Sequence, residues 1–501
     1  MSATFLGHPR GLATLFFTEM WERFTYYGMR AVLVLFLVAA VSSGGFGIDD
    51  KTAAAIYGLY TAGVYLAALP GGWIADRLIG ARQAVLIGGA LIALGNAMLA
   101  ASTAPRGFYL GLLVIVLGVG LLKPNVSAMV GELYPEGGAR LDAGFTLFYM
   151  GINLGATLGP VVTGEAQTLI GPRAGFGVAA VFMAAGVVQY YLTQHYLGTA
   201  GKFIAPTDAA AGAIARGAAA QGAVARKPWR RLWIALAAAA LAVAALSFGW
   251  LAVNPVGLAH ASTLVIATTA VLYFAYLFLA GNLSPEEKRR ALVVVVLFLG
   301  SVLFWSGYEQ AGSSLNLFAE RYTDRLLGSF VIPASWFQSL NPAFVIAFAP
   351  FVAWLWIALG RRHLSPSAPA KFAIGVILMG SGFVVMAIAA SIVAHGSKVL
   401  PYWLIATYLL HTLGELCLSP VGLSYVTKLS PKRLVGQMMG MWFLSLSLGN
   451  LAAGLIAGEF DANNVAAMPG QYMHIVYFAV GLGTVLLALS RPVRKLMGDV
   501  Q

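Results

Sequence analysis

The chain has 501 residues, of which 59% are hydrophobic and 10% are charged, and its formal net charge is +12. A soluble protein carries roughly 25% charged residues, so this composition excludes a soluble fold and indicates an integral membrane protein. Membrane proteins collect Lys and Arg in their cytoplasmic loops, so the positive charge does not indicate a nucleic-acid partner.

Apolar runs of about 20 residues, each long enough to cross a bilayer as a helix, recur along the whole chain. They predict fourteen spans, separated after the sixth by a segment rich in Ala and Gly over residues 198–231. The predicted spans cover residues 12–40, 53–75, 83–101, 108–130, 144–165, 174–197, 232–250, 261–281, 291–316, 333–358, 371–393, 401–426, 434–458 and 470–490.

This order predicts an all-α integral membrane protein with four parts. They are an N-terminal six-helix bundle (1–197), a cytoplasmic linker (198–231), two extra transmembrane helices (232–285) and a C-terminal six-helix bundle (286–501). With the N-terminus inside, 22 of the 31 Lys and Arg fall in inner segments and six in outer ones. That bias predicts cytoplasmic termini. Two six-span halves around a central site are the plan of many transporters.

The first span carries four charges, Glu19, Glu22, Arg23 and Arg30. At 100° per residue, these four and Tyr26 fall within one arc of about 100°. A charge at the bilayer centre costs at least ~2.5–3.5 kcal/mol on insertion scales, so this stripe predicts a water-filled cavity or charged partners. A structural ion-pair network is the alternative interpretation.

Other spans supply polar and aromatic groups at helical spacing, and together they suit a zwitterionic ligand. Cations could hold a carboxylate, while carboxylate and amide groups could hold an ammonium. Helix packing, interfacial anchoring and interhelical hydrogen bonds are the alternatives for each aromatic or Asn residue alone. No metal-ligand cluster and no GxSxG or HExxH motif occurs, so we expect neither an enzyme nor a bound cofactor. The candidates are Tyr57, Tyr65, Lys123, Phe145, Tyr149, Asn153, Trp305, Glu309, Gly312, Asn316, Gln338, Asn341, His411, Glu415, Ser419 and Trp442.

Several segments resemble one family. EMWERFTYYG in span one is similar to the ExxERFxYYG signature of the proton-dependent oligopeptide transporters, within the major facilitator superfamily. FTLFYMGINLGATLGP, EQAGSSLN and GELCLSPVGLSYVTKLSP resemble its spans five, seven and ten, and GGWIADRLIG resembles a loop motif of major facilitators. The resemblance covers residues 12 to about 460. It implies a major facilitator fold with 12 core helices, and the two extra helices resemble the bacterial branch.

The resemblance also implies a function and residue roles. The protein would be a monomer in the bacterial inner membrane and would import di- and tripeptides with protons by alternating access, driven by the proton gradient. Glu19, Glu22, Arg23 and Glu309 would couple proton movement to transport. Arg30 with Glu309 would form an outer gate, and Lys123 with Glu415 an inner gate. The peptide site would contain Tyr26, Tyr27, Arg30, Tyr65, Lys123, Asn153, Trp305, Asn341, Glu415, Ser419 and Trp442.

The sequence departs from the family pattern at two positions. Gly58 stands where animal members have a proton-sensitive His in span two, and Tyr308 stands where some bacterial members have a second carboxylate. His411 lies elsewhere and is expected to be a packing residue. Proton coupling would therefore depend on carboxylates. The alternatives are transport of nitrate or a drug, and a peptide sensor that does not transport.

Overall fold

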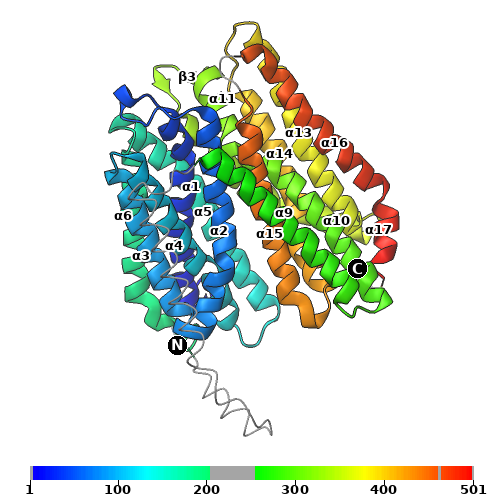
Figure 1. The fold of residues 1–501 in the computed structure, drawn as a ribbon. Helices are drawn as coiled ribbons and strands as arrows, with labels where there is room; N and C mark the ends of the chain where they lie inside the picture. Colours follow the sequence, from blue (N-terminus) through cyan, green and yellow to red (C-terminus); the bar gives the residue numbers. More distant parts are fainter. Residues whose placement is uncertain (1–3, 204–253, 461–463, 499–501) are drawn as a thin grey trace. The chain divides into compact units, whose positions relative to one another are not determined.

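The computed structural model describes residues 4–203, 254–460 and 464–498. They are mostly helical, and the predicted all-α membrane class is confirmed. The predicted span 232–250 and most of the linker 198–231 lie outside the described residues. The main helices, most of which are labelled in Figure 1, are α1 Arg10–Val38, α2 Asp50–Ile74, α3 Ala81–Ala101, α4 Pro105–Glu132, α5 Gly138–Leu169, α6 Ala174–Thr193, α9 Pro255–Ala280, α10 Pro285–Tyr308, α11 Ser314–Tyr322, α12 Leu340–Arg361, α13 Ala368–Ala394, α14 Tyr402–Leu429, α15 Val435–Ala457, α16 Met468–Ala488 and α17 Ser490–Leu496.

Short elements complete these helices. A π-helical turn continues α2 over Ala75–Ile79, and the 3-10 segment η4 (Glu309–Gly312) separates α10 from α11. The 3-10 segment η5 (Ala334–Ser339) leads into α12. Two small antiparallel hairpins were not predicted, β1 (Thr4–Phe5) with β2 (His8–Pro9) and β3 (Leu326–Leu327) with β4 (Phe330–Val331). Further 3-10 turns lie at Val41–Ser43, Gln194–Leu197, Lys432–Leu434 and Val465–Ala467.

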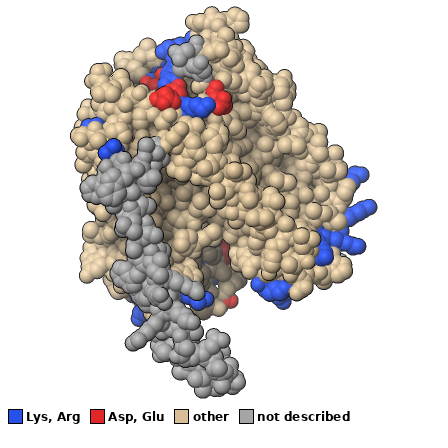
Figure 2. All heavy atoms as spheres, in the orientation of Figure 1, with Lys and Arg blue, Asp and Glu red and all other residues tan. Residues whose placement is uncertain are grey.

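Among the described residues, twelve helical segments are long and apolar enough to cross a membrane. The helix α1 is not one of these twelve, because its charged stripe interrupts the apolar run. Figure 2 shows that Lys and Arg on the visible face gather toward its edges, while the middle is nearly bare of charge. This distribution is typical of a protein whose central band faces lipid.

The described residues form two compact units that cut across the chain order. Unit 1 contains residues 4–26, 66–155 and 176–203, and unit 2 contains residues 27–65, 156–175 and 255 onward. The helices α1, α2 and α5 are therefore each divided, with one part in each unit. The bundle bounds predicted from the sequence remain a prediction.

Within unit 1, α3 and α4 pack at close range. A Cβ atom added at Gly88 would lie 2.6 Å from the carbonyl oxygen of Gly118, so only glycine allows this approach. Within unit 2, α13 packs against α14 and α16.

The described extra helix α9 also belongs to unit 2, where it packs against α15. Tyr273 of α9 donates a hydrogen bond from its hydroxyl to Gln437 of α15 at 3.2 Å. At the end of α9, the Arg433 guanidinium reaches the Asn282 carbonyl oxygen at 3.1 Å and Glu287 at 3.0 Å. These contacts attach α9 to the helices of unit 2.

Candidate functional site

The charged stripe of α1 forms a buried cluster in unit 1. Glu19, Glu22 and Arg23 are 3%, 0% and 5% exposed. Arg23 Nε lies 3.2 Å from Glu19 Oε1 and also contacts Glu22, while Lys123 of α4 interacts electrostatically with Glu19. One oxygen of each carboxylate is buried and accepts no hydrogen bond from the described residues. A carboxylate oxygen has lone pairs for hydrogen bonds, so each of these two buried oxygens could accept a further donor.

The second half of the stripe lies in unit 2 and pairs with the 3-10 segment. Arg30 Nη1 lies 2.9 Å from Glu309 Oε2, and both side chains are buried. The Tyr57 hydroxyl of α2 donates to the same oxygen at 3.3 Å, and the Arg30 guanidinium lies 4.9 Å from the centre of the Tyr27 ring. The structure thus brings together the two residues predicted for the outer gate, while their role as a gate remains a prediction.

Glu415 of α14 is the centre of a second group in unit 2. Its Oε2 atom accepts hydrogen bonds from the Tyr308 hydroxyl at 2.7 Å and from Asn341 Nδ2 at 3.0 Å. Asn341 also contacts the Thr412 hydroxyl at 3.0 Å. A carboxylate that accepts two hydrogen bonds through one oxygen has further acceptor positions, so it can receive an ammonium group.

The remaining predicted binding residues divide between the units. Lys123, Asn153 and Tyr26 belong to unit 1, so the predicted pairing of Lys123 with Glu415 of unit 2 stays a prediction. Asn153 donates to the Tyr149 carbonyl oxygen of its own helix at 2.9 Å. In unit 2 lie Tyr27, Tyr65, Trp305, Asn341, Ser419 and Trp442.

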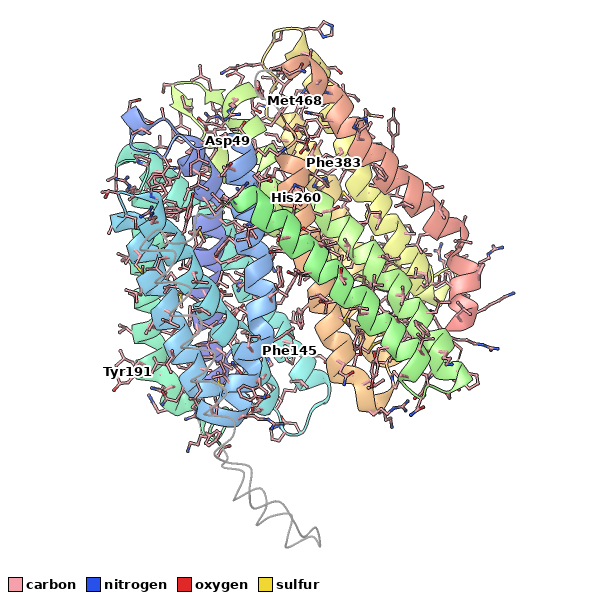
Figure 3. The ribbon with its side chains drawn as sticks, viewed as in Figure 1. Asp49, Phe145, Tyr191, His260, Phe383 and Met468 are labelled. Atoms are coloured by element: carbon pink, nitrogen blue, oxygen red, sulfur yellow. The ribbon has the colours of Figure 1, made fainter. Side chains whose placement is uncertain are left out.

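His411 and Gly58 both take part in close packing within unit 2. The His411 ring lies 5.0 Å from the ring of Phe383, which Figure 3 labels, in keeping with the packing role expected of it. A Cβ atom at Gly58 would lie 3.1 Å from Gly454 Cα and 3.1 Å from the Asn450 carbonyl oxygen. A His side chain could not fit here, because α15 occupies the space.

Sequence reasoning missed several contacts. It identified Tyr57 and Tyr308 but did not place their hydroxyls on Glu309 and Glu415. It also missed the two-pronged pair of Arg321 with Asp50, at 2.5 and 2.8 Å, beside a small pocket with Met468, labelled in Figure 3, in its wall. The partners lie more than 100 residues apart in the chain, so spacing along one helix carried no signal for them.

Comparisons with known proteins point to one family. Residues 82–474 match the model of the POT family. A peptide transporter of Yersinia enterocolitica is 41% identical over 99% of this chain and 97% of its own length. A di-/tripeptide transporter of Lactococcus lactis is 34% identical over 99% of this chain and 98% of its own length.

Solved structures agree with these relatives. A variant of the peptide transporter POT in complex with alafosfalin is similar with a TM-score of 0.87 and 37% identity, over 99% of this chain and 98% of the other. A POT family transporter in complex with 5-aminolevulinic acid has a TM-score of 0.84 and 31% identity, over 98% of both chains.

Proposed function

We propose that this chain, which belongs to the POT family, imports di- and tripeptides together with protons by alternating access. As a member of that family it is a transporter and not an enzyme. Peptide transport is supported by the names of its relatives, a peptide transporter and a di-/tripeptide transporter. The observation that carries proton coupling is the buried charge of α1, where Glu19 and Glu22 surround Arg23.

The ligand would be held at its two charged ends. Arg30 and Lys123 would take the peptide carboxylate, and Glu415 with Asn341 and Asn153 would take the ammonium. Aromatic surfaces of Tyr26, Tyr27, Tyr65, Trp305 and Trp442, with Ser419, would contact the varied side chains by area rather than by specific bonds.

Proton uptake would change the charges in two places. Protonation of Glu309 would weaken its pairing with Arg30 and release this cation for the peptide carboxylate. Protonation of Glu22 would remove a buried charge and favour the switch between conformations. Peptide bound between Lys123 and Glu415 would compete with the proposed inner gate. No cofactor is required, since one charge crossing 100 mV supplies about 2.3 kcal/mol, or roughly fiftyfold accumulation.

Uptake into liposomes tests the proposal. Purified protein in liposomes with an inward proton gradient should concentrate labelled dialanine, and an uncoupler should remove the accumulation. Unlabelled dipeptides should compete with the label, whereas nitrate should not. Competition by nitrate would favour an anion transporter, and absence of both uptake and counterflow would favour a peptide sensor. The bacterial inner membrane, the cytoplasmic termini and a monomeric state belong to the same proposal.

A further inference from the structure

The junction between α10 and η4 places two neighbouring side chains on two charged groups. Glu309 is the first residue of η4, and its carboxylate oxygen Oε2 lies 2.9 Å from Arg30 Nη1. Tyr308, the last residue of α10, donates its hydroxyl to Glu415 at 2.7 Å. Glu415 also interacts electrostatically with both Arg30 and Glu309. The residues that contact Arg30 and Glu415 are therefore adjacent in the chain.

Tyr308 is held firmly by its neighbours. Its ring stacks on Phe304 with centroids 5.4 Å apart, and it meets the Trp305 ring edge-on at 5.0 Å. The side chain is 8% exposed. A ring packed in this way cannot turn freely, so the hydroxyl position follows the backbone of the junction. We therefore expect a movement of the junction that separates Glu309 from Arg30 to displace the Tyr308 hydroxyl from Glu415 as well.

The chemistry of the two partners matches that of a peptide's ends. A carboxylate on Arg30 is what a peptide C-terminus would supply, and a hydrogen-bond donor on Glu415 is what a peptide ammonium would supply. The proposed function assigns Arg30 and Glu415 to those two ends. The Glu309 carboxylate therefore supplies an acceptor to Arg30, as a peptide C-terminus would, and the Tyr308 hydroxyl supplies a donor to Glu415, as a peptide ammonium would.

We propose that Tyr308 and Glu309 together act as an internal stand-in for the peptide, with the Tyr308 hydroxyl occupying the ammonium position on Glu415 until the ligand displaces it. This inference rests on the proposed function, and its new element is the role of Tyr308 in setting affinity for a free amino terminus. A peptide must replace both contacts, so both of its ends are needed for tight binding.

Tyr308→Phe keeps the packed ring and removes only the hydroxyl. We expect dialanine to bind this variant about tenfold more tightly, because Glu415 loses a hydrogen bond in the ligand-free protein that the ammonium otherwise has to replace. N-acetyl-dialanine lacks the ammonium, so its affinity should stay within about twofold. Binding to the full-length protein would be measured by calorimetry in detergent at one fixed pH.

The matched control is Tyr408→Phe. The Tyr408 hydroxyl donates to the Ala311 carbonyl oxygen of η4 at 3.3 Å, and among the described residues the hydrogen bonds to Glu415 come from Tyr308 and Asn341 instead. This variant should bind both peptides like the natural protein, and the melting temperatures of both variants verify folding. Equal or weaker dialanine binding by Tyr308→Phe, or an equal gain for both peptides, overturns the stand-in. Absence of dialanine binding by the natural protein overturns the proposed function and this inference together.

Discussion

Neutralising Glu309 tests how strongly the buried ion pair holds α1 against η4. Arg30 Nη1 and Glu309 Oε2 are 2.9 Å apart, and the two side chains are 6% and 3% exposed. Removing one partner of a buried pair costs about 3–5 kcal/mol, because the other charge stays buried. We expect Glu309→Gln to disfavour the observed packing within unit 2 by this amount, which corresponds to roughly a hundredfold or larger change in population.

A cysteine at Ser447 can report that change. Ser447 of α15 is fully buried and donates to the Ala62 carbonyl oxygen of α2 at 3.1 Å, so it becomes accessible only when the two helices separate. In a Cys417→Ser background, an impermeant maleimide applied from the predicted outer side should modify Ser447→Cys about a hundredfold faster when Glu309→Gln is added.

The control uses an exposed ion pair of α2, the helix whose Ala62 carbonyl oxygen Ser447 contacts. Lys51 lies 3.1 Å from Glu459, but the two side chains are 50% and 68% exposed. An exposed pair contributes about 0–1 kcal/mol, so Lys51→Gln should change the labelling rate by less than about fivefold. Equal labelling rates in the Glu309→Gln and Lys51→Gln variants would refute the reasoning.

Three further predictions address other parts of the molecule. Glu22→Gln should keep dialanine counterflow in liposomes but lose proton-driven accumulation; retained accumulation would exclude its coupling role. In a thermal unfolding assay, Gly58→Ala should lower the free energy of unfolding by about 1–3 kcal/mol, because its Cβ would lie 3.1 Å from Gly454 Cα. Gly72→Ala, whose Cβ would lie 3.9 Å from Pro124 Cβ, should be tolerated in the same thermal unfolding assay. Arg433→Ala should lower the free energy of unfolding by less than about 1 kcal/mol but speed proteolysis at residues 281–284, because Arg433 contacts Asn282 and Glu287 there. An unchanged cleavage rate would argue against a role of Arg433 in holding the end of α9.

Periodicity along the chain predicted the helices well, and contacts between helices poorly. Apolar runs locate spans because a helix must satisfy its backbone inside lipid, so the extra helix expected at 261–281 is found as Pro255–Ala280. The break between Tyr308 and Glu309 was not predicted, because residues 291–316 were interpreted as one continuous span.

Gly58 shows why contacts between helices were harder to predict. The sequence indicated only that no His stands there, whereas the close approach of Gly454 requires knowledge of which helix packs against α2. The meeting of Arg30 with Glu309 was expected only from family resemblance, because no local spacing relates residues 279 positions apart.

That separation also matters while the protein is being made. Four charges near the centre of a span cost roughly 10 kcal/mol on insertion scales, whereas each Leu, Phe or Val favours insertion by only about 0.3–0.6 kcal/mol. Glu19 and Glu22 find Arg23 within the same helix as soon as it forms. Glu309 is synthesised 279 residues after Arg30, on the order of 15–55 s later at ordinary ribosome speeds. During biogenesis the first span must therefore be held in the membrane by its neighbours or by the insertion machinery until the span that carries Glu309 arrives.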